Sequence, residues 1–440
     1  MIPYLVTELP GPKARALLAE SAQFELKSMS DEVPCVWARG EGAVIEDVDG
    51  NRLLDFSSGV LVMNIGHSHP THVAAIREQA GTLLNCYDFV SAPRVRLAKK
   101  LVEITPPNLD RAYLLTTGSE AIEAAIKIAR RATGRTEIIS FFGGFHGRTY
   151  MAMAVGGKAG VKRGFGPLVP GVLHAPFPDY YRPPVPGMTS DQVDDYCLAQ
   201  LDLLLETVST GSVAAVITET YQGAAGSRVP SKRFMQGLQA WCRAHDFVFI
   251  VDEVQASFGR TGKLFGFEHF EIQPNIITLG KGISCGVPCS AVVAESRLVD
   301  VLETGSLSST NGGNPISCRA ALASIEILES EGLVENSARL GALMMAEFAA
   351  MQQDFPCLGD VRGQGLAIGL EFVSDPVAKT PDAALAKRIV AESYQRGLVM
   401  IAPIGSFGNV IRVAPPLVLD EALARTGLGI LREALQAAVG

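Results

Sequence analysis

The feature that most constrains this chain is a repeated alternation between helical stretches and short runs of apolar residues. The helical patterns lie at about residues 70–84, 93–104, 119–134, 191–208 and 231–245. The apolar runs between and after them are Ala112–Leu115, Glu137–Phe141, Val213–Thr218, Phe247–Val251 and Ile276–Leu279. Short continuous apolar runs that alternate with helices are typical of a mainly parallel sheet covered on both faces. We therefore predict an α/β fold.

The two ends of the chain follow a different pattern and predict a second domain. Near the N-terminus, Asp49-Gly50 separates two short apolar segments and indicates a hairpin. Beyond about residue 315, two long helical patterns precede two strand-like stretches and a closing helix. We expect a large α/β domain over residues 60–315, and a smaller α+β domain built from residues 1–59 and 316–440.

Composition excludes several classes of protein. In 440 residues, 48% are hydrophobic and 19% charged, so the chain has enough apolar material for a core and is not disordered. The net charge of -8 and the lack of a basic stripe argue against nucleic-acid binding. Eight scattered cysteines do not make a disulfide framework, no apolar run approaches the ~18 residues that span a bilayer, and no secretory signal begins the chain. We expect a cytoplasmic protein.

Residues with useful chemistry follow the predicted strands, where parallel sheets bind their ligands. Gly118 and Ser119 come after one apolar run and begin a helix, whose free amides and positive end suit a phosphate. An ordinary helix cap is the alternative. Asp252 follows the run Phe247–Val251, where it either binds a cationic ligand group or caps a loop.

Lys281 lies between two glycines directly after the run Ile276–Leu279. It is either a solvated surface lysine or a Schiff-base nucleophile. Phe145 follows another run and could stack on a flat ring, whereas the neighbouring His146 is more often a packed or loop-bonding histidine. Arg412, inside an apolar strand, needs an anion, and Glu219 or a substrate carboxylate would serve.

Together these residues fit pyridoxal 5′-phosphate. This cofactor needs an anion-binding site for its phosphate, a carboxylate for its ring nitrogen, an aromatic side chain that stacks on its ring, and a lysine that binds it covalently. The motifs also resemble those of the class III pyridoxal-phosphate aminotransferases of fold type I, over nearly the whole chain and with most likeness to 4-aminobutyrate aminotransferases. The strings that carry the resemblance are Gly66-His67-x-His69-Pro70, Thr116-Thr117-Gly118-Ser119-Glu120-Ala121, Phe145-His146-Gly147-Arg148-Thr149, Asp252-Glu253-Val254-Gln255, Gly259-Arg260-Thr261-Gly262, Gly280-Lys281 and Gly312-Gly313-Asn314-Pro315.

The resemblance implies a large domain with a mainly parallel, seven-stranded type of sheet, and it implies roles for single residues. Lys281 would hold the cofactor covalently and move protons, and Asp252 would face the ring nitrogen. The other implied cofactor-binding residues are Gly118 and Ser119 for the phosphate, Phe145 and Val254 for the two ring faces, Gln255 for the ring hydroxyl, and Thr310 for the phosphate of a neighbouring subunit. A homodimer or a dimer of dimers, with active sites at the subunit interface, follows from the role of Thr310.

Substrate specificity is less determined. The resemblance implies that Arg412 binds the α-carboxylate of 2-oxoglutarate or glutamate, with Glu219 as its partner when an amine end binds. Arg148 and Val60 are the other implied substrate-binding residues. We expect transfer of an amino group from an omega-amino acid or amine, with 4-aminobutyrate as the best guess, to 2-oxoglutarate by a ping-pong mechanism.

Several alternatives stay open. Many relatives have Glu-Pro-x-Gln-Gly where this chain has Glu219-Thr220-Tyr221-Gln222-Gly223, so the pocket wall differs. Other segments resemble class III amino-acid racemases and epimerases, ornithine or acetylornithine aminotransferases, or dialkylglycine decarboxylases. A catalytically idle binding protein or a nicotinamide enzyme fits less well, since Lys281 and Asp252 are intact and no Gly-x-Gly-x-x-Gly follows the first strand. No cysteine or acid cluster completes a metal site around the histidines near residue 70.

Overall fold

All five apolar runs of the sequence form strands of one seven-stranded sheet in the computed structural model, which describes residues 2–29 and 32–440. The strand order is β4-β10-β9-β8-β7-β5-β6. The strands are β4 (Arg111–Leu115), β5 (Glu137–Phe141), β6 (Val172–Ala175), β7 (Val213–Glu219), β8 (Val248–Asp252), β9 (Ile276–Leu279) and β10 (Ser290–Ala294). Pairs from β6 through β9 are parallel, and β10 runs antiparallel to both of its neighbours. The predicted α/β fold class is confirmed.

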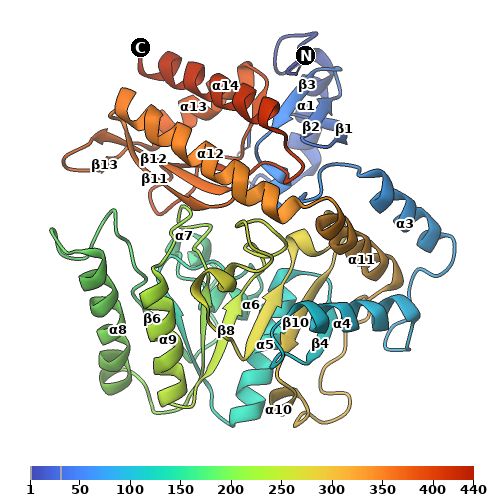
Figure 1. Cartoon of the computed structure of the whole chain (residues 1–440), viewed down its shortest axis with the longest axis vertical. Helices are drawn as coiled ribbons and strands as arrows, with labels where there is room; N and C mark the ends of the chain where they lie inside the picture. Colours follow the sequence, from blue (N-terminus) through green and yellow to red (C-terminus); the bar gives the residue numbers. More distant parts are fainter. Residues whose placement is uncertain (1, 30–31) are drawn as a thin grey trace. The chain divides into compact units, whose positions relative to one another are not determined.

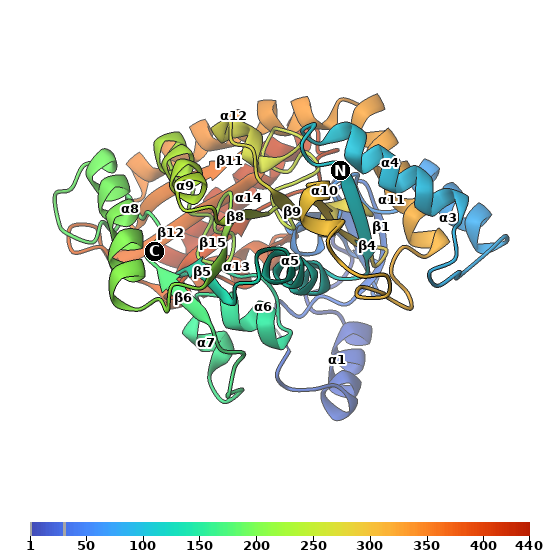
Figure 2. The same cartoon turned by 90° about the horizontal axis from the view of Figure 1, so that it is seen from below.

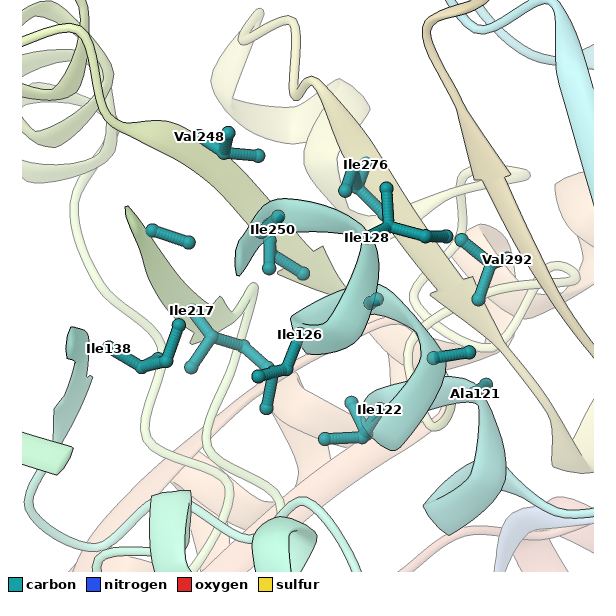
Figure 3. Close-up of a cluster of buried hydrophobic side chains, with 14 of the residues drawn as sticks. Ala121, Ile122, Ile126, Ile128, Ile138, Ile217, Val248, Ile250, Ile276 and Val292 are labelled. Atoms are coloured by element: carbon teal, nitrogen blue, oxygen red, sulfur yellow. The ribbon is translucent and has the colours of Figure 1, made fainter. Parts of the chain in front are cut away.

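Helices cover both faces of this sheet, which explains why its strands are apolar throughout. Helices α5 (Gly118–Thr133) and α9 (Lys232–Ala244) lie on opposite sides of β8 (Figure 2). In Figure 3, isoleucines of α5 meet branched side chains of the strands in a buried cluster. The remaining helices of this part are α3 (Pro70–Ala80), α4 (Ala92–Ile104), α6 (Tyr150–Val155), α7 (Ala159–Lys162), α8 (Ser190–Thr207), α10 (Ser296–Val299) and α11 (Pro315–Ser330), with short 3-10 turns η1 (Gly266–Phe270) and η2 (Lys281–Ile283).

Helix α5 shows how local sequence places an element beside the strand ends. Thr117 accepts the backbone N–H of Glu120, and the Glu120 carboxylate accepts the N–H of Thr117 in return. This reciprocal cap fixes the first turn immediately after β4. At the other end, Gly134 takes a left-handed conformation (φ 69°), which stops the helix at little steric cost.

The chain ends form two smaller sheets with their own helices. One sheet has the order β1-β2-β3-β14, from β1 (Trp37–Glu41), β2 (Val44–Asp47), β3 (Arg52–Asp55) and β14 (Leu398–Val399). The other joins β11 (Leu358–Gln364), β12 (Ala367–Asp375), β13 (Thr380–Pro381) and β15 (Val410–Val413). The helices are α1 (Pro12–Phe24), the turn α2 (Ser58–Leu61), α12 (Leu333–Asp354), α13 (Ala383–Gln395) and α14 (Glu421–Val439), with the last three at the orange-to-red end of the colour bar in Figure 1.

Contacts along the chain define two compact units. The first comprises Met1–Pro70, Gly259–Gly262 and Glu331–Gly440, and the second comprises Thr71–Phe258 and Lys263–Ser330. The domain boundaries expected from sequence, at residues 60 and 315, stay a prediction, because compactness alone does not define folding domains. Across residues 2–29 and 32–440, no helix has the length and apolar character needed to cross a membrane.

Candidate active site

The register of the large sheet brings three polar side chains to one edge. Glu219 at the end of β7 is paired with Asp252 at the end of β8, and Asp252 is paired with Thr278 of β9. Two residues after β9 ends, Lys281 begins η2. Because neighbouring parallel strands end at the same edge, residues scattered over some sixty positions of sequence meet there.

A cavity of about 250 Å³ opens at this edge, entirely within the second unit. Six of the residues predicted from sequence for the cofactor line it, together with Lys281 and Glu219. The full lining is Thr117, Gly118, Ser119, Phe145, His146, Gly147, Glu219, Tyr221, Ala224, Asp252, Val254, Gln255, Ala256 and Lys281. Its size is near the lower end of small-molecule pockets, roughly 300 Å³.

Asp252 lies at the centre of a buried hydrogen-bond network. One carboxylate oxygen lies 2.7 Å from Nδ1 of His146. The other accepts the backbone N–H of Val254 at 3.0 Å and the hydroxyl of Thr278 at 3.1 Å. Each bond favours the ionised form of a carboxylate, so the network is suited to hold a negative charge at the cavity wall.

His146 and Glu219 complete this cluster. Burial alone would lower the pKa of His146, but the hydrogen bond and charge of Asp252, with a contribution from Glu219, raise it above its usual value. Burial raises the pKa of Glu219 to about 7, and Asp252 acts in the same direction, although His146 opposes it. The Glu219 carboxylate accepts the backbone N–H groups of Phe145 at 3.0 Å and Gly223 at 3.1 Å.

The floor of the cavity is built from glycines packed against one valine. A Cβ atom at Gly118 would lie 2.8 Å from Cγ1 of Val254, and one at Gly280 would lie 3.1 Å from the same atom. Glycine therefore allows the start of α5 and the turn before Lys281 to approach Val254 closely. Lys281 itself has a left-handed backbone (φ 46°), a conformation that proteins tolerate mainly at functional sites.

Phe145 lines the cavity, and the guanidinium of Arg148 lies 5.8 Å from the centre of its ring. The backbone N–H of Arg148 also donates to the hydroxyl of Ser119 at 3.2 Å. Arg148 is exposed beside the cavity but does not line it. A cation at this place is positioned to attract an anionic substrate group.

Besides Arg148, three more residues predicted from sequence do not line this cavity. Val60 and Arg412 belong to the first unit, where Arg412 is buried in β15 opposite Gly369 of β12. Thr310 is exposed in the segment before α11. Their predicted roles stay predictions.

Sequence reasoning gave too little weight to His146 and assigned no role to Tyr221. The distance of 2.7 Å from His146 to Asp252 joins residues 106 positions apart, which no local pattern reveals. In the sequence, Tyr221 belongs to a segment that departs from the pattern typical of relatives, and that departure alone gives it no role. Its hydroxyl donates to Oε1 of Gln255 at 3.0 Å, inside the same cavity.

The chain was compared with known proteins. The family model for class III aminotransferases matches residues 26–435. The chain belongs to the class III aminotransferases. A probable 4-aminobutyrate aminotransferase of Bacillus subtilis (strain 168) is 39% identical over 420 residues, covering 94% of this chain and 96% of that protein. An alanine/serine racemase of Pyrococcus horikoshii is 34% identical, covering 99% of this chain and 93% of that protein.

Among solved structures, an (S)-enantioselective omega-transaminase from Thermomicrobium roseum superposes with a TM-score of 0.90 at 32% identity, covering 97% of this chain and 98% of that one. This class III aminotransferase is therefore an enzyme of fold type I that depends on pyridoxal 5′-phosphate and acts on an amino donor and a keto acid. The cavity fits such a cofactor, because a helix start, a buried carboxylate, an aromatic side chain and a lysine all line it. In residues 2–29 and 32–440, no cluster of three or more His, Cys, Asp or Glu side chains could hold a metal.

Proposed function

We propose that this aminotransferase moves an amino group from an omega-amino acid or amine, with 4-aminobutyrate as the preferred donor, to 2-oxoglutarate by a ping-pong mechanism. The observation that carries the proposal is the convergence of Lys281 and the Asp252 network on one cavity. The choice of donor is supported by the similarity to the probable 4-aminobutyrate aminotransferase of Bacillus subtilis. The racemase relative provides the competing outcome for the test below.

The cofactor supplies an electron sink that stabilises a carbanion at the substrate carbon. Lys281 would hold the cofactor covalently, and its amine would move a proton to and from the reacting carbons. Asp252, whose carboxylate accepts from Thr278 and from the backbone N–H of Val254, would bind the ring nitrogen of the cofactor and hold its proton. Charge placed in advance where it is needed is often the largest catalytic contribution.

The remaining residues of the cavity would bind the cofactor and orient its ring. The first amides of α5, at Gly118 and Ser119, bind the phosphate, because a helix start offers unpaired donors and a positive dipole. Phe145 and Val254 would pack on the two faces of the ring, and Gln255 would donate to its hydroxyl oxygen. His146 positions Asp252 through their hydrogen bond, and the pKa of its ring is raised by the Asp252 carboxylate.

Two arginines would bind the carboxylates of the substrates. Arg412 binds the α-carboxylate of 2-oxoglutarate, with Glu219 as its partner when the donor has no carboxylate there. Arg148, next to Phe145, is positioned to attract the far carboxylate of 4-aminobutyrate, and Val60 shapes the donor side. An amine without any carboxylate would gain nothing from Arg148.

The proposal includes a homodimer, alone or paired into a tetramer, in which Thr310 of each subunit reaches the phosphate of the other. Support comes from the exposure of large apolar side chains between α3 and α4, where Phe89 is 77% and Val90 84% exposed. Exposed apolar groups of this size are typical of protein interfaces. The cytoplasm is the proposed location, since all eight cysteines are free thiols.

The test is a panel of donors with 2-oxoglutarate, scored for glutamate. The panel includes 4-aminobutyrate, ornithine, N-acetylornithine, branched-chain amino acids and simple amines. We expect glutamate with 4-aminobutyrate, and a Lys281→Ala variant without the visible absorption band of the bound cofactor. Borohydride reduction followed by peptide mapping should place the cofactor adduct on Lys281. Inversion of an amino acid without any acceptor, and no glutamate from any donor, would replace the proposal with racemisation.

A further inference from the structure

The hydroxyl of Tyr221 and the amide of Gln255 form a partly buried pair at the cavity wall. Tyr221 is 2% exposed, and its hydroxyl donates to Oε1 of Gln255 at 3.0 Å. Tyr221 follows β7 and Gln255 follows β8, so the pair connects the ends of two adjacent strands. Both side chains line the cavity that contains Lys281.

Packing against Gly223 determines the orientation of the Gln255 side-chain amide. A Cβ atom at Gly223 would lie 1.7 Å from Oε1 of Gln255 and 3.2 Å from Nε2, so the amide oxygen lies against the Gly223 backbone. The two ends of an amide point in different directions from one carbon, so this contact directs Nε2 away from Gly223. Because Oε1 accepts from the Tyr221 hydroxyl and lies against Gly223, the donor end of the amide, Nε2, lies on its other side.

We propose that Tyr221 is a positioning residue, which holds the Gln255 amide so that its Nε2 donates to the hydroxyl oxygen of the cofactor ring. The inference rests on the role given to Gln255 under the proposed function. A primary amide that is free to rotate presents donor and acceptor alternately, and an acceptor would repel an anionic ring oxygen. The Tyr221 hydroxyl removes this ambiguity, because as a donor to Oε1 it favours one orientation over the other.

The consequence is a change in how strongly the ring oxygen attracts a proton. A donor directed at that oxygen stabilises its negative charge and lowers its affinity for the proton that it shares with the nitrogen of Lys281. Loss of the Tyr221 hydroxyl weakens the donor, so that proton is held to higher pH. The visible absorption of the bound cofactor reports this titration directly, independently of turnover.

The experiment compares Tyr221→Phe with wild-type holoenzyme in a spectrophotometric pH titration. We expect the midpoint of the absorption change to rise by about 0.5–1 pH unit, the size expected for one hydrogen bond. Tyr180→Phe is the matched control, because the Tyr180 hydroxyl is also partly buried in this unit, where it donates to Asp194 at 2.7 Å. The control should leave the midpoint unchanged, whatever its effect on stability.

A double-variant cycle separates positioning from a general effect of the lost hydroxyl. In a Gln255→Ala background, Tyr221→Phe should shift the midpoint no further. An unchanged midpoint in the single variant, or an equal shift in the Gln255→Ala background, overturns the inference. A donor panel without glutamate, alongside the predicted shift, would reject the proposed function and leave the positioning role intact.

Discussion

Two buried charged side chains, one in each unit, are stabilised in opposite ways. Asp252 lies at a cavity wall, and its nearest partner, 2.7 Å away, is the ionisable ring of His146. Arg260 is completely buried, and its guanidinium donates to the backbone carbonyls of Leu366 at 3.1 Å and Pro415 at 2.6 Å. It also donates to Oδ1 of Asn64 at 2.8 Å.

The two side chains differ in whether their hydrogen-bond partners can change protonation when a ligand binds. The neighbours of Asp252 titrate, and the pKa of Glu219 is raised to about 7, so protons in this cluster can redistribute when a ligand enters the cavity. The Leu366, Pro415 and Asn64 oxygens that Arg260 binds are neutral and lie on segments far apart in the sequence. Arg260 therefore acts as a fixed cross-link of the first unit, whereas Asp252 acts on what enters the cavity.

The largest effect is expected for Asp252→Asn. The variant is nearly isosteric but removes the charge that we assign to the ring nitrogen, so turnover should fall roughly a hundredfold to a thousandfold. Steady-state kinetics with the best donor measures the loss, and urea unfolding checks that the fold is intact. Glu253→Gln is the control, since Glu253 is the adjacent carboxylate but accepts backbone N–H groups of η1 instead. Near-normal turnover in Asp252→Asn would refute its role.

Arg260→Leu should affect stability instead of chemistry. The substitution leaves the carbonyls of Leu366 and Pro415 buried without their donor, so we expect the free energy of unfolding to fall by about 3 kcal/mol. Urea unfolding at fixed protein concentration gives the number. Arg39→Leu is the control, because Arg39 is an exposed arginine of the same unit and should change stability by less than about 0.5 kcal/mol. Equal losses of unfolding free energy in Arg260→Leu and Arg39→Leu would show that the buried contacts of Arg260 do not stabilise the fold.

Glu253 predicts a pH dependence of stability. Burial raises the pKa of this carboxyl to about 8, so the folded protein keeps its proton over a range where the unfolded chain has lost it. A group with a raised pKa stabilises the fold at low pH, and that contribution is lost as pH rises through the folded pKa. As pH rises from roughly 5 to 8, the proton held by Glu253 should therefore make the free energy of unfolding fall by about 1.4 kcal/mol per pH unit.

Urea unfolding of wild type and Glu253→Gln across this pH range measures the slope. The variant should lack the part of the slope that Glu253 contributes, while the part from Glu219, whose pKa is about 7, remains. Parallel slopes for the two proteins would mean that Glu253 does not keep its proton in the fold.

The sequence predicted the large sheet well because apolar runs between helices report burial on both faces of a strand. The five expected runs became β4, β5, β7, β8 and β9. The pattern did not identify β6, β10 or α13, because a short edge strand, an antiparallel strand and a helix next to a two-residue strand have weaker periodic signals.

For the site, the sequence located strand ends but not the contacts between them. It placed Asp252 and Lys281 at one edge, since both directly follow apolar runs. It could not distinguish the environments of Asp252 and Glu253, because Asp252 ends β8, Glu253 follows it, and only the fold shows what each side chain contacts. The Tyr221–Gln255 pair joins residues 34 positions apart and depends on the register of β7 with β8.

The smallest effect concerns a strained turn that the Arg260 cross-link helps to hold. Residues Ser58 to Leu61 all have left-handed backbones, and Val60 has a φ of 65°, which is unfavourable for a β-branched residue. A guanidinium nitrogen of Arg260 lies 3.3 Å from the Ser58 hydroxyl. Val60→Gly should therefore raise the free energy of unfolding, by up to about 1 kcal/mol after the entropy of glycine is counted.

Gly59→Ala is the matched control for this prediction. Its φ is 55°, and the nearest atom to an added Cβ would be 4.0 Å away, so the space is open and any loss comes from backbone strain alone. We expect a loss of about 1 kcal/mol in urea unfolding. If the free energy of unfolding rises in Val60→Gly and falls in Gly59→Ala, the strained backbone of this turn lowers the stability of the first unit. Changes with the reverse signs would mean that the turn relaxes in solution and that the rigid role assigned to Arg260 does not extend to Ser58.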